Sequence, residues 1–216
     1  MDDPKPLPSC LVRRYQGWHA TGHDEHRVGY RRLVLHGQHP RAMVMSCCDS
    51  RIYVASISGA DQGECFLHRN IANLVPPSVP AGEYRGTPAA IEYVVRVFQA
   101  AHLIVPGPSR RDNVQECRQI CTGAAPQPAE KTSFIGHWLD IRRPEFALVD
   151  AETEIDTQLS RLEKQAARDS CGNRISFQFV RDRVVAGLLT LHRLWTDIGA
   201  GGLGARLPEP GDCRPV

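Results

Sequence analysis

The segment with the clearest chemical potential is Cys47-x-Asp49-Ser50-Arg51, which follows the short apolar run Ala42-Met43-Val44-Met45. A cysteine thiolate is a soft ligand for zinc, and an aspartate can occupy another zinc position. An arginine two residues further can hold that aspartate off the metal through a bidentate pair. The same spacing also fits a cysteine packed under a turn whose Asp–Arg pair caps the next helix, because free cysteines are commonly buried as small hydrophobic side chains. The residues alone therefore leave a metal site and a structural turn as alternatives.

The elements around this segment predict where it lies. The apolar run is bounded by turn residues, which predicts a buried parallel strand whose carboxyl end carries residues 46–51. In open α/β sheets, sites lie at the carboxyl ends of strands. Further strands are predicted over 64–69 and 102–105, and between them a helix with Thr87 as N-cap and Pro88 at its first position. This order predicts an α/β fold with a mainly parallel β-sheet flanked by helices.

The rest of the chain is predicted to be mainly helical. We expect two helices over 8–36, interrupted at Gly22, and further helices over 112–122, 131–139, 151–167 and 177–186. Residues 188–192 and 194–198 are expected to form a hairpin or a late pair of strands. The predicted organisation is an N-terminal helical arm (1–40), an α/β domain (41–206) and a loose C-terminal tail (207–216).

Composition limits the classes of function. The 216 residues are 42% hydrophobic and 23% charged, which is typical of a soluble globular protein and excludes a disordered tail protein. Lys and Arg number 26 against 24 Asp and Glu, with no block of like charge, so we expect no nucleic-acid partner. No run of 18 apolar residues occurs, and the chain opens with Met1-Asp2-Asp3. We therefore expect no membrane association, no signal peptide and a cytoplasmic protein.

The eight cysteines are scattered along the chain, with Cys47 and Cys48 adjacent. This pattern does not indicate a secreted disulfide framework, because such frameworks belong to much shorter chains. Metal ligation, catalysis and core packing remain as alternatives for these thiols.

Several motifs in order and spacing resemble the β-class carbonic anhydrases, over about residues 10–205. They are Gly37-Gln38-x-Pro40-x-x-Met43-Val44-x-x-Cys47-x-Asp49-Ser50-Arg51, Arg69-Asn70-Ile71-Ala72-Asn73-Leu74-Val75-Pro76-Pro77, Gly86-Thr87-x-Ala89-Ala90-Ile91-Glu92-Tyr93, His102-Leu103-Ile104-Val105, Val180-Arg181, Gly187-x-Leu189-x-Leu191-His192 and Asp197-Ile198.

The resemblance implies a zinc enzyme that interconverts carbon dioxide and bicarbonate, with a parallel α/β domain and N-terminal helices used for dimerisation. In the family, zinc is held by the Cys of the Cys-x-Asp-x-Arg motif and by a His and a Cys, three residues apart, just after the third strand. Cys47 matches the first ligand. Asp49 matches the carboxylate that closes the fourth position or yields it to water, and Arg51 matches its partner, so these two form the catalytic dyad that the resemblance implies.

The resemblance fails at the other two ligands. The family reads Gly-His-Ser-x-Cys-Gly-Gly after the third strand, whereas this chain reads Gly107-Pro108-Ser109-Arg110-Arg111-Asp112-Asn113. Pro108 and Arg111 thus stand at the ligand positions. Proline has no side-chain donor atom, and a guanidinium is a permanent cation without a lone pair to offer. We therefore expect weak zinc binding, no resident cofactor, and zinc-dependent activity that is lost or very weak.

Other residues offer partial substitutes. Cys117 and Cys121 lie four apart on one predicted helix face, but Cys117 is six residues past the ligand position, about 9 Å along a helix axis. Cys65 and His68 lie on the neighbouring predicted strand.

Two arginines suggest other roles for the position at which the family binds zinc. Arg111 could neutralise Asp49 in place of zinc, or it could simply point to solvent. Arg69 suits a bicarbonate-like anion, because a guanidinium binds a carboxylate-like group bidentately, or it could pair within the dimer.

Three functions therefore compete. The first is a divergent β-carbonic anhydrase relative that has lost, or nearly lost, zinc-dependent hydration. The second is a non-catalytic assembly or sensor protein that is a homodimer or higher oligomer and binds bicarbonate or another small anion through Arg51, Arg69 or Arg111. The third is an enzyme that uses Cys47 or Cys48 as a nucleophile made reactive by nearby arginine.

Overall fold

The computed structural model describes residues 5–79, 86–108, 119, 134–142, 169, 172–197, 202–206 and 213–215. The chain divides into two compact units, Met1–His39 and Pro40–Val216. The helix predicted over 151–167 lies outside the described residues, as does the helix predicted over 112–122 apart from position 119. None of the helices in the described part is long and apolar enough to cross a membrane.

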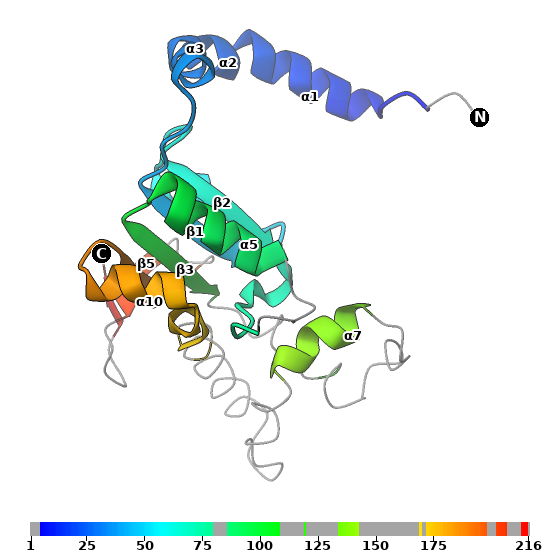
Figure 1. The fold of residues 1–216 in the computed structure, drawn as a ribbon. Coiled ribbons are helices and arrows are strands. Elements are labelled where there is room, and N and C mark those ends of the chain that lie inside the picture. The colour runs from blue at the N-terminus through cyan, green and yellow to red at the C-terminus, as the bar shows by residue number, and fades with distance from the viewer. Residues whose placement is uncertain are drawn as a thin grey trace. The chain divides into compact units, whose positions relative to one another are not determined.

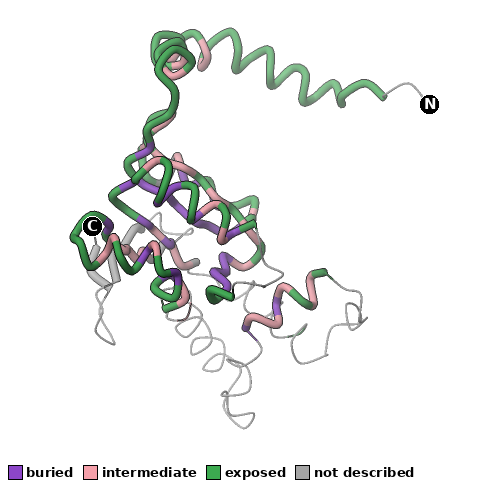
Figure 2. The backbone as a smooth tube through the Cα atoms, viewed as in Figure 1, coloured by how far each residue is buried: buried purple, intermediate pink, exposed green. Residues whose placement is uncertain are grey.

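The first unit is a helical arm made of α1 (Ser9–Ala20), α2 (Gly22–Glu25) and α3 (Arg27–His36). The sequence predicted two helices with a break at Gly22; the structure places this break at Thr21, directly before Gly22, and has a second break at His26. No residue of these helices is buried, as Figure 2 also shows for the arm. The ring of His23 stacks on Tyr30 with centroids 5.5 Å apart and meets Trp18 edge-on at 5.6 Å. Aromatic contacts thus join the arm's helices.

The second unit contains a six-stranded sheet in the order β2-β1-β3-β4-β5-β6. The strands β1 (Ala42–Cys47), β2 (Cys65–Asn70), β3 (His102–Pro108) and β4 (Thr190–Asp197) are parallel. The strands β5 (Gly202–Arg206) and β6 (Cys213–Pro215) are antiparallel additions at one edge. The predicted α/β fold with a mainly parallel sheet is confirmed.

The connections are short helices. They are α4 (Val54–Ser58), the 3₁₀ turn η1 (Ile71–Asn73), α5 (Gly86–Glu92), the π-helical continuation η2 (Tyr93–Phe98), α7 (Phe134–Leu139), the 3₁₀ turn η3 (Asp140–Arg142) and α10 (Gln178–Val185). The α5–η2 segment and α10 cover one face of the sheet (Figure 1), where they enclose a core that includes Met43, Met45, Ile91, Leu103 and Val180. A smaller cluster contains Val44, Cys47, Ile52 and Val54.

Two local predictions were wrong, each where a partner distant in sequence decides the structure. Helix α5 begins at Gly86 rather than after an N-cap at Thr87, which is buried and hydrogen-bonded to β2. Residues 190–197 form one strand parallel to β3 instead of two strands. Within residues 207–216, β6 pairs with β5, with Arg214 opposite Ala205. Pro215 is tolerated there because β6 is an edge strand.

A buried arginine joins two of the parallel strands. The side chain of Arg174 is 1% exposed, and its Nη1 donates to the carbonyl oxygens of Leu103 on β3 (2.9 Å) and His192 on β4 (3.1 Å). A buried carbonyl that loses its donor costs free energy because water cannot replace the bond. Arg174 therefore fastens β4 to the strand that leads into the site.

We predict that Arg174→Met lowers the free energy of unfolding by at least about 1–3 kcal/mol, the cost of orphaning a buried hydrogen-bonding group. The matched control is Arg181→Met on the exposed side of α10, which should change stability by less than about 0.5 kcal/mol. Urea denaturation followed by circular dichroism measures both variants. If Arg174→Met is as stable as the Arg181→Met control, the hydrogen bonds from Arg174 do not contribute to the stability of the fold.

Candidate functional site

The site is built on the turn that follows β1. Cys47 is the last residue of that strand, is 7% exposed, and packs against the apolar cluster of Val44, Ile52 and Val54. Cys48 is exposed. The amide of Cys48 donates to Asn70 O (3.0 Å), and the amide of Ile52 donates to Asp49 O (3.0 Å). The chain therefore reverses over residues 49–52 at the carboxyl edge of the parallel sheet, where the sequence placed it.

Asp49 and Arg51 form the bidentate pair that their spacing predicted. Asp49 Oδ1 accepts from the backbone amide (2.9 Å) and Nε (2.9 Å) of Arg51, and Oδ2 accepts from Nη2 (2.6 Å). The side chain of Asp49 is 8% exposed and that of Arg51 is 38% exposed. The carboxylate is thus shielded from water and fixed in one orientation by a charge-assisted fork.

Arg69, at the end of β2, holds the turn from the neighbouring strand. Its Nε donates to Cys47 O (3.0 Å), and its Nη2 donates to Asp49 O (2.8 Å) and Ile52 O (2.9 Å). The sequence suggested an anion-binding role for Arg69, which stays a prediction, and it missed this structural role. The signal that could have revealed it was the position of an arginine at the carboxyl end of a strand adjacent to the motif.

Two asparagines shape the segment that follows β2. The amide group of Asn70 donates to Leu74 O (2.8 Å) and accepts from Leu74 N (2.8 Å). Asn73 is 5% exposed, and its Nδ2 donates to Pro106 O on β3 (2.7 Å). Ala72 and Asn73 have φ values of 62° and 54°, in the left-handed region that non-glycine residues seldom occupy. Sequence reasoning missed both asparagines, which tie the end of β3 to the end of β2.

The third strand ends without a metal ligand. Strands β1 and β3 are neighbours, with Val44 opposite Ile104, and Pro108 is the last residue of β3. The other substituted position, Arg111, and the thiols of Cys117 and Cys121 lie outside the described residues.

The alternative donors on β2 have other surroundings. His68 Nε2 lies 3.0 Å from Thr87 Oγ1, and burial lowers the pKa of His68. Burial, and then the charge of Glu64, raise the pKa of the Cys65 thiol, which disfavours the thiolate that a metal needs. Among the residues that the structure describes, no three His, Cys, Asp or Glu side chains form a group that could hold a metal ion.

These donors do not fit a catalytic zinc site. Such a site takes three protein ligands and keeps a fourth position for water. The described part of the site offers the thiol of Cys47 and the carboxylate of Asp49, which is already held by Arg51. Proline at position 108 contributes no donor atom.

Comparisons with known proteins agree on one family. The carbonic anhydrase family model matches residues 42–203. Beta carbonic anhydrase 3 of Arabidopsis thaliana is 32% identical over 167 residues, which cover 76% of this chain and 63% of that protein.

Solved structures share the fold. The β-carbonic anhydrase CcaA superposes with a TM-score of 0.84 at 24% identity, covering 96% of this chain and 98% of that chain. A tetrameric β-carbonic anhydrase from Sordaria macrospora superposes with a TM-score of 0.72 at 23% identity, covering 95% and 98% of the two chains. Because the family model matches most of the chain and the Arabidopsis thaliana relative is 32% identical over 76% of it, this chain belongs to the β-carbonic anhydrase family.

Proposed function

We propose that this chain is a β-carbonic anhydrase family protein whose zinc-dependent hydration of carbon dioxide is lost or very weak. The observation that carries the proposal is Pro108 at the carboxyl end of β3, the strand beside the one that ends in Cys47. The family resemblance places a histidine ligand at that position and a cysteine ligand at Arg111. Neither residue present can bind a metal ion.

The chemistry of the reaction explains why these two positions matter. Hydration near neutral pH requires a source of hydroxide, which the metal in such enzymes supplies by lowering the pKa of bound water to about 7. The retained Asp49–Arg51 pair can orient a neighbouring group, but a carboxylate whose two oxygens accept bonds from arginine is a poor base. The retained Asp49–Arg51 pair is therefore better suited to stabilising the turn than to catalysing hydration.

The alternative function, an enzyme with a cysteine nucleophile, is less plausible for Cys47 than for Cys48. Cys47 is 7% exposed and lies in an apolar cluster, so a substrate cannot reach it without movement of the turn. Cys48 is exposed and remains accessible to reagents. We therefore place any thiol chemistry at Cys48 rather than at Cys47.

We further propose that the chain forms homo-oligomers through its N-terminal arm. Several large apolar side chains of α3 are strongly exposed, with Val28 at 82%, Val34 at 85% and Leu35 at 78%. An exposed apolar surface of this kind is typical of an interaction site. The structural relative from Sordaria macrospora is a tetrameric β-carbonic anhydrase, which is consistent with association.

We predict that protein purified without added zinc contains well under one zinc per chain and hydrates carbon dioxide at the uncatalysed rate. The reason is that two of the three expected ligands are replaced by residues without donor atoms. Plasma mass spectrometry measures the metal, and stopped-flow pH-indicator kinetics measure hydration. Stoichiometric zinc that disappears in Cys47→Ser would contradict the proposal.

We predict that the double variant Pro108→His with Arg111→Cys binds more zinc than either single variant, because it restores the missing donors. Zinc affinity should rise first, and hydration activity should follow only if the fourth position is open to water. Competition titration with a chromophoric chelator measures the affinity. If the double variant binds no more zinc than Arg111→Cys alone, the path of the loop, and not only its ligand chemistry, differs from the family.

We predict a mass of at least twice 24.0 kDa in solution at micromolar concentration. The variant Val34→Glu with Leu35→Glu should raise the dissociation constant at least about tenfold, the effect of about 1.4 kcal/mol. Val185→Glu on α10 is the matched control, since Val185 is equally exposed at 83% but lies outside the arm. Sedimentation velocity measures all three proteins, and a monomeric wild-type chain would refute the arm's role.

A further inference from the structure

We propose that His102 and His192 form a two-histidine site for a divalent transition-metal ion such as Zn²⁺, which joins β3 to β4 when it binds. His102 is the first residue of β3, and His192 is the third residue of β4. Pro108, which stands at a ligand position of the family's zinc site, is at the other end of β3, about 20 Å away. The proposed site is therefore distinct from the family's zinc position and independent of the function proposed above.

The two imidazoles lie on the same face of the sheet. In the register of the two strands, His102 is opposite Thr190. His192 is opposite Ile104, so the two histidines are diagonal neighbours on adjacent strands. Side chains alternate between the two faces of a strand, and Leu103 belongs to the core that α5 and α10 cover. The histidine rings therefore lie on the opposite face, where His102 is exposed and His192 is partly exposed.

The facing nitrogens have the separation that a chelated metal ion requires. His102 Nδ1 lies 3.0 Å from His192 Nε2. The ring centroids are 5.0 Å apart, and the ring planes are inclined at 64°. Two Zn–N bonds of about 2.0–2.1 Å, at an angle of about 90–110°, hold their nitrogens about 2.8–3.4 Å apart. A metal ion can therefore take the place of the direct contact without a change in the spacing of the strands.

Both imidazoles can offer a lone pair to the ion at once. A neutral imidazole carries one proton, which either ring nitrogen can hold. In the metal-free pair, one facing nitrogen donates to the other. When the ion binds, the donating ring carries its proton on its outer nitrogen instead, so both facing nitrogens become ligands and no proton is lost. Burial, then the charge of His102 and then that of Arg174, lower the pKa of His192, which favours the neutral ring that a metal ion needs.

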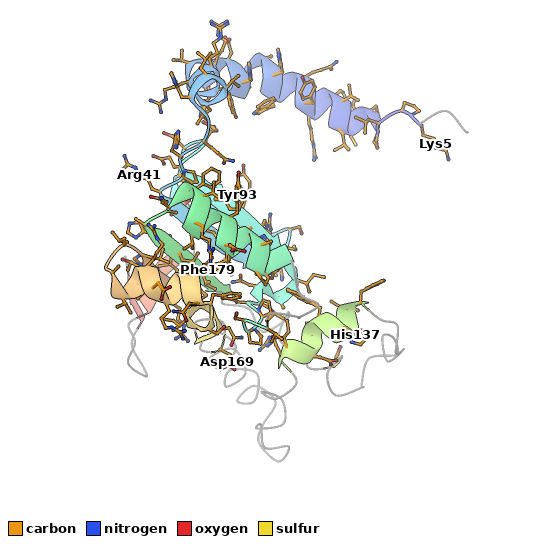
Figure 3. The ribbon with its side chains drawn as sticks, viewed as in Figure 1. Lys5, Arg41, Tyr93, His137, Asp169 and Phe179 are labelled. Carbon is orange, nitrogen blue, oxygen red and sulfur yellow. The ribbon has the colours of Figure 1, made fainter. Side chains whose placement is uncertain are left out.

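The backbone that carries the two histidines is held in place before any ion binds. Arg174 Nη1 donates to the carbonyl oxygen of His192 (3.1 Å) and to that of Leu103 (2.9 Å), the residue after His102. The amide of His102 donates to the carbonyl oxygen of Arg41 (3.3 Å), the residue that precedes β1 and is labelled in Figure 3. Ligands that are positioned in advance cost little free energy to order on binding.

Two features make this site weak and exchangeable. In the described part of the chain, no third His, Cys, Asp or Glu joins the pair, so water completes the coordination. Structural zinc sites that bind tightly use four protein ligands. The guanidinium of Arg174 also repels a bound cation. We therefore expect the ion to be lost during purification without added zinc, which is consistent with the low zinc content predicted above.

NMR of the ¹⁵N-labelled full chain, titrated with zinc chloride at pH 7.5, tests the site directly. The imidazole signals are assigned with His102→Gln and His192→Gln. We expect the resonances of His102 Nδ1 and His192 Nε2 to shift together and to saturate, while the two outer nitrogens stay protonated. If only one of them shifts at millimolar zinc, or neither does, the two rings share a hydrogen bond only and the proposal is wrong.

The affinity of the variants provides the second test. Loss of either ring should weaken zinc binding at this site by at least about tenfold, as measured by isothermal titration calorimetry. His19→Gln is the matched control. The rings of His19 and His23 are also close, with centroids 5.1 Å apart, but they are stacked with 4° between their planes. Lone pairs that lie in parallel planes do not converge on one ion, so this variant should bind zinc as the wild type does. Equal affinities in all these proteins would overturn the proposal.

The two proposals fail separately. Stoichiometric zinc that depends on Cys47 contradicts the loss of hydration proposed above, and the NMR titration still decides whether the histidine pair binds the ion. Absence of the joint shift at His102 and His192 contradicts the histidine site alone. If a histidine variant does not fold, the wild-type signals are assigned through correlations within each residue, and the titration of the wild-type chain decides.

Discussion

The interaction on which the site depends is the set of three hydrogen bonds from Arg69 to the backbone carbonyls of Cys47, Asp49 and Ile52. A chain that leaves a parallel strand and reverses at once presents carbonyls that the sheet no longer satisfies, and unsatisfied carbonyls are costly where water is limited. One guanidinium, with several donors in a rigid plane, satisfies three of them from the adjacent strand. The turn can then place the Asp49 carboxylate in a shielded position, where Arg51 donates hydrogen bonds to both of its oxygens.

The end of β3 is fixed by a different device. Asn73 reaches Pro106 O from a segment in which two consecutive residues adopt left-handed backbone conformations. Such conformations persist only where surrounding contacts enforce them, and here the side chains of Asn70 and Asn73 do so. Among the described residues, the β1 turn is thus held by the cation of Arg69 and the β3 end by the neutral amide of Asn73.

The sequence predicted the parts of this structure that depend on local pattern. The apolar run at 42–45 predicted β1. The spacing of Asp49 and Arg51 predicted their pair, because side chains two residues apart in a tight turn can lie on the same side and form hydrogen bonds. It failed where a distant partner decides. Thr87 looks like an N-cap locally, but β2 provides its hydrogen bonds. Residues 188–198 look like a hairpin, but the long pairing with β3 keeps β4 continuous. The roles of Arg69 and Asn73 were missed because both act on backbone atoms of other elements, which no local pattern records.

The β1 turn is held by hydrogen bonds from β2 to its backbone. This explains how a chain could keep the family's fold without the family's full set of metal-ligating side chains. Arg69 and Asn70 of β2 bond to backbone atoms of the β1 turn, so these contacts do not require particular side chains in the turn itself. The substitutions that remove donors stand at Pro108 and Arg111, after the last contact that Asn73 makes with Pro106. Under the function proposed above, Arg69 would hold the turn without help from a metal. The fold of the turn depends on bonds from Arg69 of β2 to backbone carbonyls, whereas metal chemistry depends on side-chain donor atoms, so one can be kept without the other.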